Sequence, residues 1–229
     1  MLRRLLIAAP DAQAARALAE ALPREEFLPR VETSSEDALE CALAWRPDCV
    51  LLDSELARLP AVELCGRLKA DPRTQRTPIL MISPRRDQAL VNRALSGGAD
   101  DFMVHPCHPT ELAWRVRGLL RRYEAPAPRS ETLRLGPFEL NTDQGLALVG
   151  GKPVELTRTE LSMLELFVRN PSRVLNRRFL LENVWGYDRS VQTRVVDLCV
   201  YQLRKKLGAR WGRCLATRRN FGYFLKLDA

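Results

Sequence analysis

The chain of 229 residues is predicted to fold as two domains, an α/β domain built on a parallel sheet and a smaller, basic α+β domain. Its length is long for one domain and sufficient for two that each bury a core. Before residue 124, short apolar runs alternate five times with segments of helical period, a pattern typical of parallel sheets covered on both faces. The stretch YEAPAPRSE, residues 123–131, mixes two prolines with small and polar residues and indicates a linker.

The first part can be divided into five pairs of a strand and a helix. The pairs are LLIAA with DAQAARALAEAL, FLPRVET with SEDALECALAW, CVLLD with AVELCGRLKA, PILMIS with QALVNRALSGG, and DFMV with PTELAWRVRGLLRR. In such sheets functional groups collect at the carboxyl ends of the strands. Asp53, Ser83 and His105 end three of these strands and are therefore expected at the same edge.

The second part begins with alternating apolar and polar residues around Gly, Asn and Asp turns, which predicts a short antiparallel meander. A helix follows that opens with Thr157 and Glu160, the pattern of a capping box. RRFLLENVWGY predicts a second short helix, SVQTRVVDLCVYQLRKKLG a third, and CLATRRNFGYFLKL a hairpin with arginines near its tip. The third helix is expected to bury one stripe, formed by Val196, Val200, Leu203 and Leu207.

The charge is distributed unevenly along the chain. Residues 1–124 contain 18 Lys or Arg and 18 Asp or Glu, so the formal net charge of +8 falls entirely on residues 125–229. This asymmetry favours an anionic partner, most often nucleic acid. No export signal and no membrane span are recognised, so we expect a cytosolic protein without a membrane partner. The six cysteines lack zinc-site spacing, and we interpret most of them as small buried residues; no cofactor is expected.

The motifs PDCVLLD, TPILMIS and GGADDFMVHPCHPTEL, with the amphipathic helix that follows, resemble the receiver domain of bacterial response regulators. The resemblance covers roughly residues 3–123 and implies a flavodoxin-like (βα)5 fold. It also implies that Asp53 occupies the phospho-acceptor position and that Ser83, Phe102 and His105 occupy switch positions. His105 stands where the family has a lysine that pairs with the acylphosphate.

The sequence departs from this family at the metal site. The family places two adjacent acids at the end of the first strand, and this chain has Ala9-Pro10 there, followed by Asp11. Mg²⁺ prefers oxygen ligands, and charge neutralisation is most of the catalysis of phosphoryl transfer. We therefore expect control independent of phosphorylation, with Asp53 accepting hydrogen bonds from the backbone of the following turn. A conventional phosphorylation-dependent regulator that uses Asp53 remains the alternative.

Two further features of the receiver-like part carry hypotheses. The HPCH cluster of His105, Cys107 and His108 is either a metal or redox sensor or an ordinary loop in which Cys107 replaces an apolar residue. In the resembled family, charged residues on the fourth helix, fifth strand and fifth helix pair two receivers, which predicts a homodimer. The alternative is an ordinary solvated face. The corresponding residues here are Asp100, Asp101, Glu111, Arg115 and Arg122.

The second part, over roughly residues 132–228, closely resembles the winged helix-turn-helix effector domain of the OmpR/PhoB family. The pattern runs from LTRTE through NPSRVLNRRFLLENVWGYD to LRKKLG and TRRNFGY. It implies a recognition helix at 190–207 and a wing at 214–224, in which Asn220 replaces a glycine whose φ asparagine can adopt. The positions implied to contact DNA are Arg177, Arg178, Arg194, Leu198, Cys199, Tyr201, Gln202, Arg204, Lys205, Thr217, Arg218 and Arg219.

Together the two resemblances predict a sequence-specific transcriptional regulator, not an enzyme, whose partner is double-stranded DNA. The domains are expected at 1–123 and 132–229, joined by a linker at 124–131. WGYDRS matches a loop that in this family contacts RNA polymerase, with Asp188 or Arg189 exposed and Trp185 as an anchor of the local core. Whether a sensor kinase acts on the protein stays open.

Overall fold

The structure is a computed structural model, which describes residues 2–85, 87–124, 132–141, 145–187 and 194–227. The chain divides into two compact units, residues 1–124 and 125–229, and each is described by itself. Of the predicted linker only Glu124, the last residue of the final helix of the first unit, is among the described residues. The remainder of that segment lies outside them.

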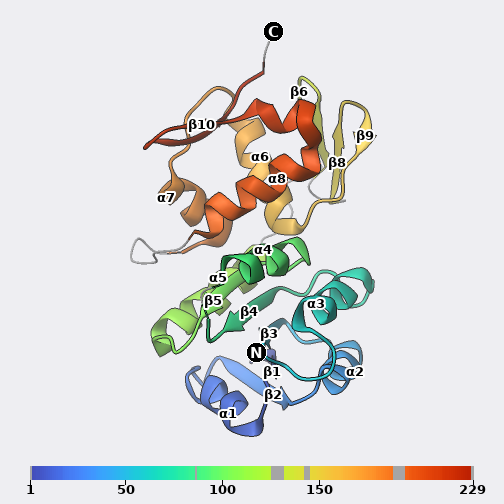
Figure 1. Cartoon of the computed structure of the whole chain (residues 1–229), viewed down its shortest axis with the longest axis vertical. Helices are drawn as coiled ribbons and strands as arrows, with labels where there is room; N and C mark the ends of the chain where they lie inside the picture. The colour runs from blue at the N-terminus through green and yellow to red at the C-terminus, as the bar shows by residue number, and fades with distance from the viewer. Residues whose placement is uncertain (1, 86, 125–131, 142–144, 188–193, 228–229) are drawn as a thin grey trace. The chain divides into compact units, whose positions relative to one another are not determined.

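The first unit is an α/β domain in which strands and helices alternate along the described residues (Figure 1). Its strands are β1 (Arg3–Ala8), β2 (Phe27–Glu32), β3 (Cys49–Asp53), β4 (Ile79–Ser83) and β5 (Asp101–Val104). Its helices are α1 (Ala12–Glu20), α2 (Ser35–Trp45), α3 (Ala61–Ala70), α4 (Gln88–Ser96) and α5 (Pro109–Glu124). All neighbouring strands pair in parallel, so the predicted (βα)5 fold is confirmed.

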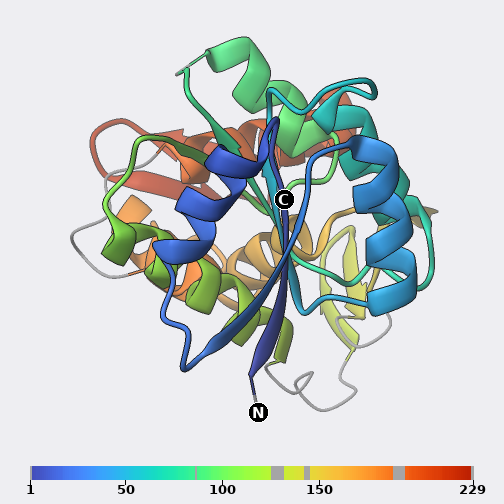
Figure 2. The ribbon, with the colours of Figure 1, turned by 90° about the horizontal axis from the view of Figure 1, so that it is seen from below.

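The strand order β2-β1-β3-β4-β5 determines where the site lies. Helices α1 and α5 cover one face of the sheet and α2 and α3 cover the other, as Figure 2 shows, and α4 packs beside α3. Continuous apolar strands are required because both faces are covered; every residue of β3 and β4 is buried. The chain reverses its winding between β1 and β3, the switch point at which ligands bind in such folds. Asp53 ends β3 at this point.

The second unit contains an antiparallel sheet, helices and a C-terminal hairpin. The sheet has the order β6-β7-β8-β9 and comprises β6 (Thr132–Leu135), β7 (Phe138–Asn141), β8 (Leu146–Val149) and β9 (Lys152–Pro153). The helical segments are α6 (Arg158–Arg169), α7 (Arg177–Leu180) continued by the π-helical turn η1 (Leu181–Trp185), α8 (Val195–Trp211) and the 3₁₀ turn η2 (Gly212–Cys214). The hairpin pairs β10 (Leu215–Arg218) with β11 (Gly222–Leu225). The predicted α+β winged-helix architecture is confirmed.

Local sequence signals explain the ends of two helices. Thr157 and Glu160 form the predicted capping box at the start of α6, each side chain bound to the other residue's backbone N–H. Gly208 interrupts α8 with a φ of 74°, so regular helix ends after Leu207. The predicted apolar stripe of α8, from Val196 to Leu207, is buried. Among the described residues, every helix is too short or too polar to cross a lipid bilayer.

Candidate functional site

One face of α8 exposes side chains at helical spacing. Arg194 precedes the helix, and Leu198, Tyr201 and Lys205 follow it at intervals of four, three and four residues. Arg194 and Lys205 are exposed, Leu198 is half-buried, and Tyr201 is 54% exposed. The opposite face is buried in the domain core, so this stripe lies on the outer surface of the domain. A major groove is wide enough to admit one α-helix.

Two residues predicted to face the groove are buried instead. Cys199 and Gln202 each follow the exposed stripe by one residue, which turns them about 100° around the helix axis toward the core side. Both lie beside the buried Val200 and Leu203. The assignment of Cys199 and Gln202 to the DNA-facing surface is therefore corrected: in this structure they pack inside the domain.

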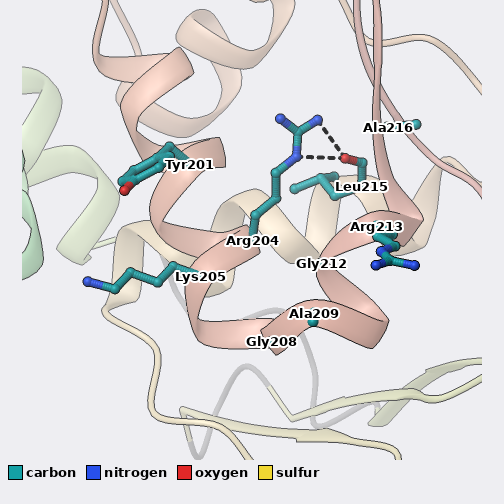
Figure 3. A pocket seen from close by; sticks show the side chains of 9 residues that line it. All are labelled: Tyr201, Arg204, Lys205, Gly208, Ala209, Gly212, Arg213, Leu215 and Ala216. Carbon is teal, nitrogen blue, oxygen red and sulfur yellow. Dashed lines mark hydrogen bonds between the residues drawn. The ribbon is translucent and has the colours of Figure 1, made fainter.

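Arg204 ties the recognition helix to the wing. Its Nε and Nη2 atoms donate to the carbonyl oxygen of Leu215 at 2.8 and 2.6 Å, and Nη2 also donates to the hydroxyl of Thr217 at 2.7 Å. Figure 3 shows this guanidinium turned toward Leu215, while Tyr201 and Lys205 point to another side of the helix. The same figure shows that these residues, with Arg213 of η2, border one open groove. The sequence did not predict the link between Arg204 and the wing.

A second polar cluster fixes the base of the wing. Arg177 of α7 donates to Asp197 of α8 at 2.7 Å, and the hydroxyl of Tyr223 in β11 donates to the same carboxylate oxygen. The guanidinium of Arg177 also lies 5.0 Å from the centroid of the Tyr223 ring. Arg178 is exposed and pairs with Glu182 one helical turn later, at 3.2 Å. The two arginines predicted near a phosphate are thus both exposed and both paired within the domain, Arg177 with Asp197 and Arg178 with Glu182.

The wing presents a basic, exposed tip. Thr217, Arg218 and Arg219 are all exposed, and Asn220 has a φ of 66°. The prediction that Asn220 adopts the backbone conformation of the glycine it replaces is therefore confirmed. The N–H of Phe221 donates to the carbonyl of Arg218 at 3.0 Å and closes the turn. Two adjacent arginines at the end of a hairpin suit an anionic surface.

At the carboxyl edge of the receiver sheet, Asp53 is enclosed. It is 2% exposed, and its Oδ1 accepts from the N–H of Glu55 at 2.8 Å, which confirms the predicted backbone contact in the following turn. Its Oδ2 lies 3.3 Å from Nε2 of His105. Burial raises the pKa of Asp53, and the Glu55 N–H and His105 only partly oppose that rise.

Two of the predicted switch residues, Ser83 and His105, lie at the same edge. Ser83 is buried, and its hydroxyl accepts from the N–H of Arg85 at 3.2 Å. Its carbonyl accepts from the N–H of His105 at 2.9 Å, which joins the ends of β4 and β5. Phe102 is buried within β5. The expectation that Asp53, Ser83 and His105 gather at one edge is therefore confirmed.

Comparisons with known proteins agree with both domains. Residues 5–117 match the response regulator receiver domain family, and residues 151–225 match the family described as transcriptional regulatory protein, C terminal. The response regulator ArlR of Staphylococcus saprophyticus is 33% identical over 225 residues, 97% of this chain and 99% of that protein. The phosphate regulon transcriptional regulatory protein PhoB of Rhizobium meliloti is 38% identical over 192 residues, 83% of this chain and 84% of that protein. The chain belongs to the OmpR/PhoB family of response regulators.

A solved structure gives the same result for the fold alone. DrrB of Thermotoga maritima, described as an OmpR/PhoB homolog, superposes with a TM-score of 0.51 at 23% identity and covers 99% of this chain and 100% of its own. As an OmpR/PhoB-family member, the protein is a DNA-binding response regulator with a winged helix-turn-helix domain.

The receiver of this OmpR/PhoB-family regulator does not offer the ligands that Mg²⁺ needs. Ala9 is buried and apolar, and Pro10 has no acidic group. Asp11, the nearest acid in the sequence, caps α1 by accepting from the N–H of Ala14 at 2.8 Å. Asp53 ends β3 beside this end of β1 without the acid pair, and Mg²⁺ demands near-octahedral oxygen coordination. The residues present therefore do not fit the ion that the fold family implies.

Cys107 and His108 of the HPCH cluster make ordinary contacts within the receiver. Cys107 packs against the hydrophobic core of the receiver, as expected for a replacement of an apolar residue, and burial raises the pKa of its thiol. His108 accepts from the N–H of Thr110 at 3.3 Å through Nδ1, at the start of α5. In residues 2–85, 87–124 and the described parts of the second unit, no three His, Cys, Asp or Glu side chains converge as metal ligands.

Part of the predicted dimer face lies inside the receiver. Arg115 is buried and donates to Asp101 at 2.8 Å and to Glu111 at 2.7 Å. Asp101 is also fully buried, whereas Glu111 remains partly exposed. The expectation of an exposed charged face is therefore corrected for Asp101 and Arg115, because their charges neutralise each other between β5 and α5.

Asp100 is likewise internal, in a cluster that sequence reasoning missed. Its carboxylate accepts from Lys69 of α3 at 2.8 Å, from the hydroxyl of Tyr123 and from the N–H of Ile79. Burial disfavours both charges, but the pairing still raises the pKa of Lys69 and lowers that of Asp100. Arg122 adds to the lowering. Asp100 is thus removed from the exposed dimer face as well.

The predicted polymerase-contact residues, Asp188 and Arg189, lie outside the described residues, so their role stays a prediction. The neighbouring Trp185 is fully buried. Its predicted role as an anchor of the local core is confirmed.

Proposed function

We propose that this regulator controls transcription by binding double-stranded DNA through the exposed face of α8 and the β10–β11 wing, without Mg²⁺-dependent phosphorylation of Asp53. The observation that carries the first half is the stripe of Arg194, Tyr201 and Lys205 on a helix that Arg204 fastens to the arginine-bearing wing. Base edges are read by side chains in the groove, and arginines near phosphates supply salt-sensitive affinity.

The chemistry at Asp53 supports the second half. An acylphosphate on this carboxylate needs positive charge to offset that of the phosphoryl group, and phosphoryl transfer is catalysed mostly by such neutralisation and by positioning. Within the described residues, the side chain that can carry positive charge against Asp53 is His105, at 3.3 Å, and apolar Ala9 stands where the family has the first acid of the metal pair. Asp53 is also almost without exposed surface, which hinders attack on a donor.

The test is intact-mass measurement after incubation with a small acyl phosphate donor and Mg²⁺. We expect no phosphoryl adduct on the wild type. The matched variant Ala9→Asp/Pro10→Asp/His105→Lys restores the acid pair and the lysine and is expected to gain an adduct that an added Asp53→Ala change removes. Stoichiometric phosphorylation of the wild type at Asp53 would establish instead the conventional phosphorylation-dependent regulator.

We also propose that the protein acts in the cytoplasm as a homodimer paired through the α4, β5 and α5 face, and that its polymerase contact lies at residues 188–189. Because Arg115 and Asp101 neutralise each other within one receiver, and Arg122 acts on the internal Asp100, the dimer contact is assigned to the partly exposed Glu111. Sedimentation of the wild type and of Glu111→Lys tests this. A dimer that Glu111→Lys leaves intact would exclude the assignment.

A further inference from the structure

Phe221 is an exposed aromatic residue at the tip of the wing. At 67% exposure it is the most exposed large hydrophobic side chain of the described residues. It follows Arg218, Arg219 and Asn220 in the turn between β10 and β11. The ring has no role in the domain core, and the predictions from sequence assigned it none.

The base of the wing is bound to other parts of the domain. These contacts, as well as the hairpin, position the tip that carries the ring. Leu175 and Tyr223 exchange backbone hydrogen bonds at 2.8 and 3.0 Å. Gly222, next to Phe221, has a φ of 150°, and a Cβ there would lie 2.1 Å from the carbonyl oxygen of Leu175. Only glycine therefore permits this close approach. Arg204 adds its bonds to Leu215 and Thr217 on the other strand.

The charges around the ring identify its partner. Arg218 and Arg219 are exposed beside it, and a strongly basic tip disfavours an apolar protein groove and favours a polyanion. The narrow minor groove of A·T-rich DNA has an enhanced negative potential that attracts arginine. An apolar side chain carried into that groove can enter between base pairs and unstack them, as wedge residues do in other minor-groove binders.

We infer that Phe221 is a wedge that enters the minor groove beside Arg219, partly unstacks one base step and bends the duplex. This inference rests on the proposed DNA-binding function and specifies how the wing selects sequence. Pyrimidine–purine steps unstack most easily, so the wing is expected to select such a step next to an A·T-rich flank. The selection is indirect, because the ring reads the deformability of the step and not its hydrogen-bonding groups.

The test uses duplexes enriched by the full-length wild type from a random-sequence library. Binding, bend angle by fluorescence energy transfer, and unstacking reported by 2-aminopurine at the wing step are measured for wild type, Phe221→Ala and Phe221→Leu. Phe221→Ala is expected to lose the bend and the 2-aminopurine signal and to weaken binding roughly tenfold, with the salt slope unchanged. Phe221→Leu should keep most of the bend, because leucine also serves as a wedge.

A matched control is Leu146→Ala, which removes another exposed apolar side chain of the same domain, 51% exposed on β8, and is expected to behave as the wild type. If Phe221→Ala bends and unstacks the duplex as the wild type does, the wedge is excluded. The wedge is also excluded if the wild type does not bend the duplex. If Phe221→Ala then still binds more weakly, the ring is assigned to packing against sugars. If the wild type enriches no duplex, the proposed DNA-binding function itself fails, a result distinct from both others.

Discussion

The two domains differ in how many of the functional residues of the family pattern they contain. In the C-terminal domain the capping box, the exposed stripe of α8 and the basic wing all occur where the family pattern implies them. In the receiver the (βα)5 fold is complete, but Ala9, Pro10 and His105 stand at positions where phosphoryl chemistry needs acids and a lysine. The receiver fold therefore does not depend on the residues of its phosphorylation site.

Two buried aspartates of the receiver show why the fold can form without the residues of the phosphorylation site. Asp100 is paired with Lys69, and its pKa is lowered despite burial. Asp53 accepts a hydrogen bond from the N–H of Glu55 and lies 3.3 Å from His105, but burial still raises its pKa. Removing one member of a buried ion pair destabilises a fold strongly because the other charge is left uncompensated, whereas a buried charge without a full partner already costs free energy. Asp100 therefore belongs to the architecture, and Asp53 is dispensable for it.

The largest expected effect is on stability, when the ion pair between Lys69 and Asp100 is broken. Asp100→Asn leaves Lys69 with an uncompensated buried charge and should lower the free energy of unfolding of the receiver by about 3–5 kcal/mol at neutral pH, measured by urea denaturation. Because the folded pKa of Asp100 lies below its ordinary 3.8, its contribution is complete above that pH and is lost as the pH falls further. The difference between variant and wild type should therefore shrink only below about pH 3.8.

Glu63→Gln is the control for this experiment, since Glu63 pairs with Arg67 on the surface of the same helix as Lys69. Exposed pairs of this kind contribute little. An Asp100→Asn protein as stable as Glu63→Gln would contradict the distinction between the two buried aspartates.

The next largest effect concerns the link between the recognition helix and the wing. Arg204→Ala removes the bonds to Leu215 and Thr217 and should destabilise the C-terminal domain by about 1.5–3 kcal/mol while weakening binding to specific and scrambled duplexes alike. Lys205→Ala, one residue along, should leave stability unchanged and lower the salt slope by about one unit. If Arg204→Ala is fully stable and weakens only the specific duplex, the residue reads a base instead.

A smaller effect is expected at the wing. Arg219→Ala removes one exposed cation from the tip and should weaken binding most for duplexes with A·T-rich flanks, with the salt slope lowered by about one unit. Binding isotherms at several salt concentrations measure both quantities. Equal weakening for A·T-rich and G·C-rich flanks would mean that Arg219 contacts only the backbone.

The smallest effect is expected at Asp53. Asp53→Ala should change DNA affinity by less than tenfold, or about 1.4 kcal/mol, and Asp53→Glu should not activate binding. Because the folded pKa of Asp53 is raised, the ionised group disfavours the folded state above its ordinary pKa of 3.8, so Asp53→Asn should raise the melting temperature of the receiver at neutral pH. A melting temperature that falls with Asp53→Asn would show that the ionised carboxylate has a stabilising partner.

Sequence reasoning succeeded where the signal is local and periodic. The strands of the receiver are continuous apolar runs, and the buried stripe of α8 follows from residues three and four apart. It failed by one position for Cys199 and Gln202, because the edge between a buried and an exposed helical face depends on what packs against it.

Contacts between segments that are distant in the sequence could not be predicted either. Lys69 and Asp100 are 31 residues apart, and nothing near either residue indicates that they pair. Arg204 bonds mainly to the backbone carbonyl of Leu215. Because any residue at position 215 would offer the same carbonyl, the sequence does not indicate this bond. The exposed position of Phe221 needed the hairpin register before it could be seen.

A single affinity measurement tests whether DNA binding is independent of phosphorylation. The Kd of the full-length wild type for a library-enriched duplex is determined with and without an acyl phosphate donor and Mg²⁺, beside Asp53→Ala. We predict the same Kd, within about threefold, in all four conditions. A tightening of tenfold or more on addition of donor and Mg²⁺, present in the wild type and absent in Asp53→Ala, would contradict the account.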